Sequence, residues 1–214
     1  MEIIAIENRL AAISSERNRI ASDLHDDIGA ALSSIHIYST VAVKKFKSGN
    51  DIENLLLRIK ETSAGLLERM SDIIWSINPE HEKLRDLKLR IKTFAADLLF
   101  PLGISINYEL QETDDELYVA VLERKNIYLS CKEIINNIAK HSAATHVKLC
   151  LKQKDNRLHC TFTDNGRGFD TLKPTTGNGI RNMKRRIKDV GGDFYYSSQL
   201  GAGTEIEFSV PLTN

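Results

Sequence analysis

The chain has 214 residues, which is enough for one large domain or two small ones. Lys+Arg and Asp+Glu both number 29, so no excess of positive charge favours binding to nucleic acid or to an anionic membrane. Hydrophobic residues make up 42%, as in ordinary globular proteins, and no run of about 18 apolar residues could span a bilayer. The three cysteines form no C-x-x-C pair, which indicates reduced cytosolic thiols rather than a metal site.

The first 47 residues contain no proline and a single glycine, Gly29. Apolar residues recur there at alternating spacings of four and three, which predicts a long helix with a coiled-coil seam: Leu24, Ile28, Ala31, Ile35, Tyr38 and Ala42. Residues 48–51 supply a turn and a helix N-cap. A second helical seam follows and ends at Asn78-Pro79: Ile52, Leu56, Ile59, Ser63, Leu66, Met70, Ile73 and Ile77.

Two long helices joined by a short turn predict an antiparallel hairpin. A lone hairpin cannot bury both faces of two such helices, so we expect two copies to pair into a four-helix bundle and form a homodimer. The alternative is that the hairpin packs on the second half of the same chain.

A different pattern begins at Leu84 and predicts an α+β fold. We expect helices over 84–99, 122–140 and 181–190, and strands over 104–110 and 158–163. Val147, Leu149 and Leu151 alternate with polar residues, as do Ile206, Phe208 and Val210, so both stretches predict strands with one buried face. This order favours a sandwich in which helices cover one side of a mixed sheet.

The run from Glu16 to Gly29 contains the first candidate for chemistry. His25 follows the seam position Leu24, so it lies on the flank of the helix, where a neutral imidazole could act as a nucleophile. Asp26 could fix the tautomer of that imidazole and raise its basicity. Gly29, one turn beyond, would let a bulky phosphate donor approach. The alternative is a solvated helix face with an incidental histidine.

This run resembles the phosphoacceptor helix of two-component sensor histidine kinases, in the subfamily that includes nitrate and membrane-fluidity sensors. The pattern of that subfamily is E-R-x-R-I-A-x-x-L-H-[DE]-x-x-G-Q. The resemblance implies that His25 accepts a phosphoryl group and that Asp26 is its acid/base partner. The sequence departs from the pattern at Ala30, where the family places a glutamine that helps to orient the water that dephosphorylates the regulator. We therefore expect weak phosphatase activity.

Polar residues and glycines in the second half suggest a nucleotide site. Glu133, Asn137 and Lys140 or His141 share one face of a predicted helix, and a carboxylate and an amide one turn apart can hold hydrated Mg²⁺. Asp164 ends a predicted strand and opens D-N-G-R-G-F, so its carboxylate could accept a hydrogen bond from an exocyclic amine. Taken singly, these features also fit a solvated helix face and a tight turn.

Two further glycine pairs follow. Gly177-Asn178-Gly179 opens a helix whose free N–H groups favour phosphate, and Gly201-Ala202-Gly203-Thr204 precedes the last strand, where a hairpin turn is the alternative. The order of these pieces resembles the N, G1 and G2 boxes of the Bergerat ATP-binding fold. The resemblance implies Asn137 on Mg²⁺, Glu133 oriented on water or metal, Asp164 on the adenine amine, and a short ATP lid over 170–176. The other nucleotide-binding residues it indicates are Lys140, His141, Gly166, Gly168, Gly177, Gly179 and Thr204.

Together these patterns predict a dimerisation and phosphoacceptor hairpin over 1–79 and a catalytic ATP-binding domain over 84–214, joined by a hinge at 78–83. ATP would phosphorylate His25, and the phosphoryl group would pass to an aspartate in the receiver domain of a response regulator with a helix-turn-helix output domain. We expect a cytoplasmic location, with a membrane link only through an N-terminal region absent from this sequence.

Two rival functions remain open on the sequence. The first is a serine kinase or ATPase of the same ATP-binding superfamily, which would need no phosphoacceptor helix. The second is a dimeric scaffold that binds ATP only as a conformational ligand.

Overall fold

The computed structural model describes residues 28–49, 51–110, 117–171 and 178–212. The chain divides into two compact units, Met1–Asn78 and Pro79–Asn214. Within the described residues, no helix combines the length and the apolar character that a bilayer crossing requires.

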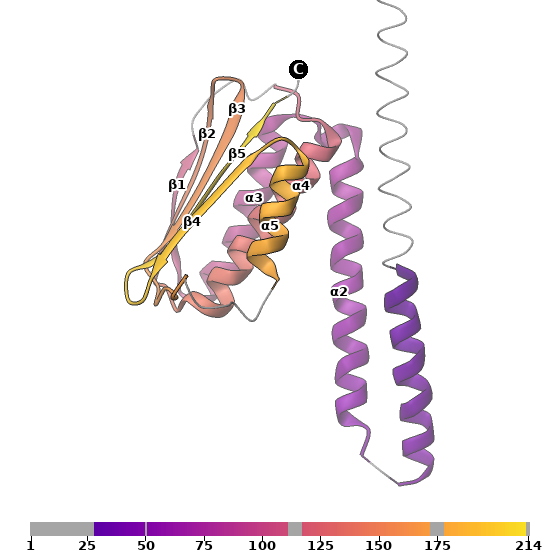
Figure 1. Ribbon diagram of the computed structural model, residues 1–214. Helices are drawn as coiled ribbons and strands as arrows, with labels where there is room; N and C mark the ends of the chain where they lie inside the picture. Colours follow the sequence, from indigo (N-terminus) through magenta and orange to yellow (C-terminus); the bar gives the residue numbers. More distant parts are fainter. Residues whose placement is uncertain (1–27, 50, 111–116, 172–177, 213–214) are drawn as a thin grey trace, which may run out of the picture. The chain divides into compact units, whose positions relative to one another are not determined.

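The first unit is a helical hairpin. Residues 28–47 are helical, Gly49 turns the chain with a positive φ of 70°, and α2 (Glu53–Ile77) returns antiparallel to the first helix (Figure 1). The Asp51 carboxylate accepts a hydrogen bond from the Glu53 N–H at 2.9 Å, although the N-cap position itself is Ile52. The predicted end of this helix is confirmed, because Asn78 is extended and Pro79 follows it.

The hairpin buries only part of its apolar surface. Four apolar residues are buried, two on each helix: Ala31, Ala42, Leu66 and Ile73. On α2, Leu56, Leu67 and Ile74 fall on a different face of the helix and are 53%, 64% and 55% exposed. Leu56 was expected in a buried seam, and within one hairpin it is not buried. The first helix likewise exposes apolar side chains on one face: Leu32, Val43 and Phe46.

The second unit is an α+β sandwich, as predicted. Its helices are α3 (Leu84–Leu99), α4 (Val121–Asn137) and α5 (Gly179–Asp189). Its strands are β1 (Ser105–Leu110), β2 (His146–Lys154), β3 (Arg157–Asp164), β4 (Asp193–Gln199) and β5 (Gly203–Pro211). Short 3₁₀ turns lie at Pro79–His81 and Phe100–Leu102, and a π-helical turn, Ile138–Ser142, extends α4.

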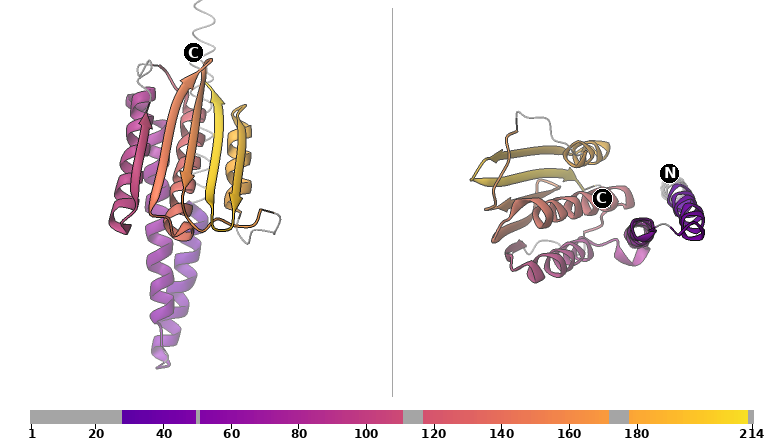
Figure 2. Two further views of the ribbon diagram at one scale, coloured as in Figure 1. Left: turned by 90° about the vertical axis from the view of Figure 1, so that its left-hand side faces the viewer. Right: turned by 90° about the horizontal axis from the view of Figure 1, so that it is seen from below.

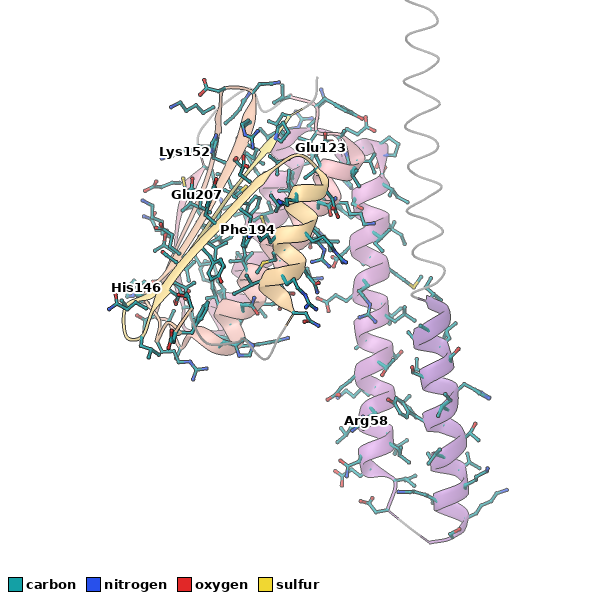
Figure 3. All side chains as sticks on the ribbon, in the orientation of Figure 1. Arg58, Glu123, His146, Lys152, Phe194 and Glu207 are labelled. Atoms are coloured by element: carbon teal, nitrogen blue, oxygen red, sulfur yellow. The ribbon has the colours of Figure 1, made fainter. Side chains whose placement is uncertain are left out.

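The described strands form a mixed sheet in the order β1-β2-β3-β5-β4, in which β1 and β2 are parallel and the other pairs are antiparallel. All three helices cover the same face of this sheet (Figure 2). Alternating strand residues point to the helices and form the core: Leu149, Leu151, Leu158, Cys160, Phe162, Ile206, Phe208 and Val210. Phe194 lies between β4 and α5, whereas Lys152 and Glu207 are exposed (Figure 3).

Candidate nucleotide-binding site

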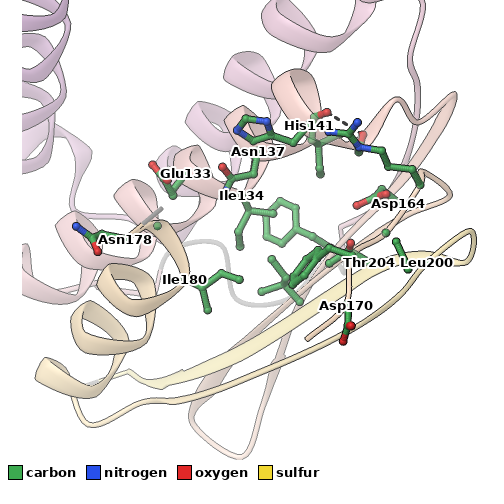
Figure 4. Close-up of a pocket in the computed structure, with 18 residues that line it drawn as sticks. Glu133, Ile134, Asn137, His141, Asp164, Asp170, Asn178, Ile180, Leu200 and Thr204 are labelled. Carbon is green, nitrogen blue, oxygen red and sulfur yellow. Dashed lines mark hydrogen bonds between the residues drawn. The ribbon is translucent and has the colours of Figure 1, made fainter. Parts of the chain in front are cut away.

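A pocket of about 810 Å³ lies between α4, the N-terminal end of α5 and the helix-facing side of β3 and β5. Apolar side chains form much of its lining: Ile134, Ile138, Phe162, Phe169, Ile180, Leu200 and Ile206. Among the polar groups, Glu133 and Asn178 lie at one end and Asp164 and Thr204 at the other, with Asn137 and His141 between them (Figure 4). A large, mostly apolar pocket with a few polar groups is typical of a small-molecule site.

The end of α4 determines which of its polar residues reach the pocket. Glu133, Asn137 and His141 line it, whereas Lys140 does not and is exposed. The reason is the π-helical turn over Ile138–Ser142, because a wider turn shifts the following residues around the helix axis. His141 therefore stays in line with Glu133 and Asn137, while Lys140 rotates away.

The first turn of α5 lies against this polar end. A Cβ atom at Gly179 would lie 2.6 Å from the Glu133 Oε1 and 3.6 Å from the Asn137 Nδ2. The absence of a side chain at Gly179 thus lets the N-terminus of α5 approach both polar groups. Its free N–H groups are suited to an anionic group of a ligand.

Asp164 occupies the other end and is only 7% exposed. Its Oδ1 accepts a hydrogen bond from the Gly166 N–H at 2.8 Å, and the Thr204 N–H also donates to the carboxyl group. Burial raises the pKa of Asp164 above its usual value, while these two donors act in the opposite direction. A buried carboxylate with lone pairs still free is suited to a ligand N–H donor.

The glycines of the D-N-G-R-G-F segment allow close packing against neighbouring backbone groups, which a side chain would prevent. A Cβ at Gly166 would lie against the Ser142 carbonyl oxygen, and one at Gly168, where φ is 59°, would meet the Gln199 carbonyl oxygen. The same segment is held by a hydrogen bond from the Arg167 N–H to the Ser142 carbonyl at 2.8 Å. Gly168 lines the pocket, whereas Gly166 does not.

The structure thus brings most of the expected residues together: Glu133, Asn137, His141, Asp164, Gly168, Gly179 and Thr204. Lys140 and Gly166 lie outside the lining, and His25, Asp26 and Gly177 fall outside the described residues. Sequence reasoning missed lining residues that neighbour the predicted ones in the same motifs, such as Arg167, Phe169 and Asn178. Their position beside the predicted glycines in the sequence is the signal from which they could have been predicted.

Comparison with known proteins finds a matching family model for each half of the chain. A family model described as "Histidine kinase" matches residues 16–82, and one described as "Histidine kinase-, DNA gyrase B-, and HSP90-like ATPase" matches residues 123–214. The chain belongs to the sensor histidine kinase family. The second family model covers every described residue of the pocket and implies that the pocket binds ATP.

Curated relatives agree with this assignment. The sensor histidine kinase LiaS of Bacillus subtilis is 28% identical over 94% of this chain and 56% of its own length. The histidine-protein kinase/phosphatase UhpB of Salmonella typhimurium is 26% identical over 96% of this chain and 40% of its own length. The chain therefore spans about half the length of the curated relatives it matches.

Solved structures show the same fold. The Acinetobacter baumannii histidine kinase AdeS superimposes with a TM-score of 0.57 at 19% identity, over 85% of this chain and 96% of that one. The blue-light activated histidine kinase of Erythrobacter litoralis gives 0.58 at 16% identity, over 90% of this chain and 60% of that one.

Proposed function

We propose that this chain is the catalytic core of a dimeric sensor histidine kinase that uses ATP to phosphorylate its own His25. The observation that carries the proposal is the pocket with Asp164 and Thr204 at one end, Glu133 at the other and Asn137 between them. It occurs in a chain whose residues 16–82 match a histidine kinase model.

The two ends of the pocket suggest the orientation of ATP. The adenine would lie at the buried Asp164, with its exocyclic amine donating to the carboxylate, and the apolar lining would cover the faces of the ring. The phosphates would lie towards Glu133, Asn137 and the N-terminus of α5. His141 and the N–H groups at Gly179 would contact the phosphates there.

Mg²⁺ fits the polar end as a cation shared with the nucleotide. Among the described residues, no group of three or more His, Cys, Asp or Glu side chains could hold a metal. Asn137 would supply an amide oxygen, and phosphate and water oxygens would complete the shell, as is usual for Mg²⁺. Bound there, the ion would neutralise charge on the phosphates.

The chemical step is a transfer to a ring nitrogen. The lone pair of the His25 imidazole would form an N–P bond to the γ-phosphorus while the bond to the β–γ bridging oxygen breaks and ADP leaves. The proton on the other ring nitrogen would pass to Asp26. Glu133 would orient a water or metal ligand at the phosphates. His25 and Asp26 lie outside the described residues, so these two roles rest on the sequence.

We further propose the division of labour expected from the sequence: a dimerisation and phosphoacceptor hairpin over 1–79 and a catalytic domain over 84–214. The exposed apolar residues of the hairpin support pairing of two copies, because burying them would complete a four-helix bundle. The phosphoryl group would pass to the receiver domain of a response regulator with a helix-turn-helix output domain, in the cytoplasm.

The decisive experiment is incubation with γ-labelled ATP followed by acid or base treatment. We expect label that is lost in acid and retained in base, as for phosphohistidine, and no label in His25→Gln despite unchanged ATP binding. Base-labile, acid-stable label would favour the serine kinase alternative. ATP binding with no label at all would favour the scaffold alternative.

A further inference from the structure

Ser198 of β4 lies next to the pocket residues Phe169 and Thr204 and takes part in three hydrogen bonds. Its hydroxyl lies 2.9 Å from the Phe169 N–H, 2.9 Å from the Gly203 carbonyl oxygen and 2.9 Å from the Thr204 Oγ1. Ser198 and Thr204 are paired across the β4–β5 ladder, so this arrangement follows from the register of the hairpin. Thr204 lines the pocket, whereas Ser198 does not.

The direction of each hydrogen bond follows from what each group can do. A hydroxyl has one proton and two lone pairs. The Phe169 N–H can only donate, so it uses one lone pair of the Ser198 oxygen. The Gly203 carbonyl can only accept, so it takes the Ser198 proton. In the remaining contact either hydroxyl could donate in principle, but Ser198 has no proton left, so Thr204 must be the donor.

This assignment sets the polarity of the pocket wall. Because the Thr204 proton is used on Ser198, the Thr204 oxygen can offer only lone pairs to a ligand. Thr204 is paired with Asp164 across the β3–β5 ladder, and its N–H already donates to the Asp164 carboxyl group. The Asp164 carboxylate and the Thr204 hydroxyl oxygen, which both line this end of the pocket, are therefore both acceptors (Figure 4).

We infer that Ser198 is a positioning residue for base selectivity: by accepting the Thr204 proton, it makes the Thr204 oxygen, like the Asp164 carboxylate, an acceptor towards the base. Such a wall fits the 6-amino group of adenine, which presents two N–H donors. It opposes a 6-oxo purine bound in the same pose, because the oxygen in place of the amino group would face lone pairs. This inference rests on the proposed placement of the adenine at Asp164.

Without the Ser198 oxygen, the Thr204 hydroxyl would be free to rotate and donate into the pocket. Ser198→Ala should therefore weaken ATP binding and improve the relative binding of inosine triphosphate, a 6-oxo purine nucleotide. We expect the ratio of the two affinities to fall about five- to ten-fold, the usual effect of one hydrogen bond. Ser198→Thr keeps the hydroxyl on a β-strand and should keep the ratio.

The test is calorimetric titration of the full chain with ATP and with inosine triphosphate, with thermal melting to verify folding. Thr204→Val removes the Thr204 hydroxyl itself, so it should also reduce the ratio of the two affinities. This variant provides the test if Ser198→Ala does not fold. In the Thr204→Val background, Ser198→Ala should change the ratio no further, because the hydroxyl on which it acts is gone.

Equal losses of affinity for both nucleotides in Ser198→Ala would overturn the inference and leave Ser198 with a purely structural role. An unaltered protein that binds both nucleotides equally would also overturn it, while leaving the nucleotide site intact. Failure of the unaltered protein to bind any nucleotide would instead refute the proposed function itself.

Discussion

The two units of this chain differ in how completely they bury their own apolar side chains. In Pro79–Asn214, the core-facing residues of α3 are fully buried at a spacing of three or four: Leu84, Leu87, Ile91, Ala95 and Leu99. In the described part of Met1–Asn78, four apolar residues are buried and nine large ones are exposed. The second unit can therefore fold around its own core, whereas the hairpin offers apolar surface to a partner.

This difference suggests that the two units respond differently to mutation. Nucleotide binding should depend on geometry inside one unit, because every residue that lines the pocket belongs to Pro79–Asn214. Phosphorylation of His25 should depend on both units and on the dimer. Variants that lose autophosphorylation but keep ATP binding, or the reverse, therefore test this difference between the two units directly.

The largest expected effect is at Asn137. Asn137→Ala should reduce autophosphorylation at least about 100-fold, because it removes the side chain proposed to hold Mg²⁺ against the phosphates. The measurement is incorporation of label from γ-labelled ATP at saturating nucleotide. Asn136→Ala is a matched control, since Asn136 is the neighbouring residue on α4 and is not part of the pocket lining. Similar loss in both variants would indicate damage to the helix rather than to the site.

The next effect concerns the exposed apolar face of α2. Leu67→Glu combined with Ile74→Glu should dissociate the homodimer, because two carboxylates would have to be buried in the bundle. Light scattering at micromolar concentration should report half the mass, while ATP affinity should stay within about two-fold, because every residue that lines the pocket belongs to the other unit. Arg69→Glu changes the net charge equally on a different face and should leave the dimer intact. A dimer that survives the double substitution would place the interface elsewhere.

Sequence reasoning predicted the elements well where periodicity was strong. The helix over 84–99 is confirmed at both ends, and the buried faces of β2 and β5 are the predicted ones. The position of Asp164 at the end of β3 is also confirmed. Each of these features follows from local residue patterns, which need no knowledge of the rest of the fold.

Two features of the site were beyond that reasoning because they depend on tertiary geometry. The π-helical turn at Ile138–Ser142 selects His141 over Lys140, whereas an α-helical pattern left both open. The contact between Ser198 and Thr204 depends on the register of β4 and β5 across a turn, and a single serine carries no motif for it.

A smaller effect is expected at Asp164. Asp164→Asn should weaken ATP binding about 10- to 100-fold, because it removes a charged acceptor for the adenine amine. Because burial raises the pKa of Asp164, ATP affinity in the unaltered protein should fall with decreasing pH sooner than it would for an exposed aspartate. Titration of both proteins with ATP across pH measures this. The part of the pH dependence that comes from protonation of Asp164 should be present in the unaltered protein and absent from Asp164→Asn.

The same pKa predicts an opposite effect on folding. A carboxyl group whose pKa is higher in the folded than in the unfolded state binds its proton more tightly when folded. Its contribution to stability therefore decreases as pH rises through the window between the two values. Above that window, removal of the buried charge in Asp164→Asn should raise the melting temperature relative to the unaltered protein, and the difference should shrink as pH falls through the window. A lower melting temperature at neutral pH would mean that the hydrogen bonds from Gly166 and Thr204 outweigh the burial of the charge.

The smallest expected effect concerns Ala30, which lies exposed on the helix over 28–47 and follows Asp26 by four residues in the sequence. Dephosphorylation of a regulator needs a water in line with its phosphoaspartate, and a side-chain amide can hold that water through a hydrogen bond. Alanine has no such group, so the unaltered protein should be a weak phosphatase. Ala30→Gln should raise the rate about five-fold, as expected for one hydrogen bond, and leave autophosphorylation unchanged, because that step uses no attacking water.

The measurement for Ala30 is the decay of purified phosphorylated regulator in the presence of ADP and each variant. Ala30→Leu is the matched control, because it adds bulk at the same exposed position without an amide. The backbone should tolerate both changes, since the Ala30 carbonyl, which accepts a hydrogen bond from the Ser34 hydroxyl at 3.0 Å, is unaffected by the side chain. If the unaltered protein already accelerates the decay strongly and the glutamine adds nothing, another group must hold the water. Asp27 is then the nearest candidate in the sequence, and its replacement by asparagine would be the next variant to measure.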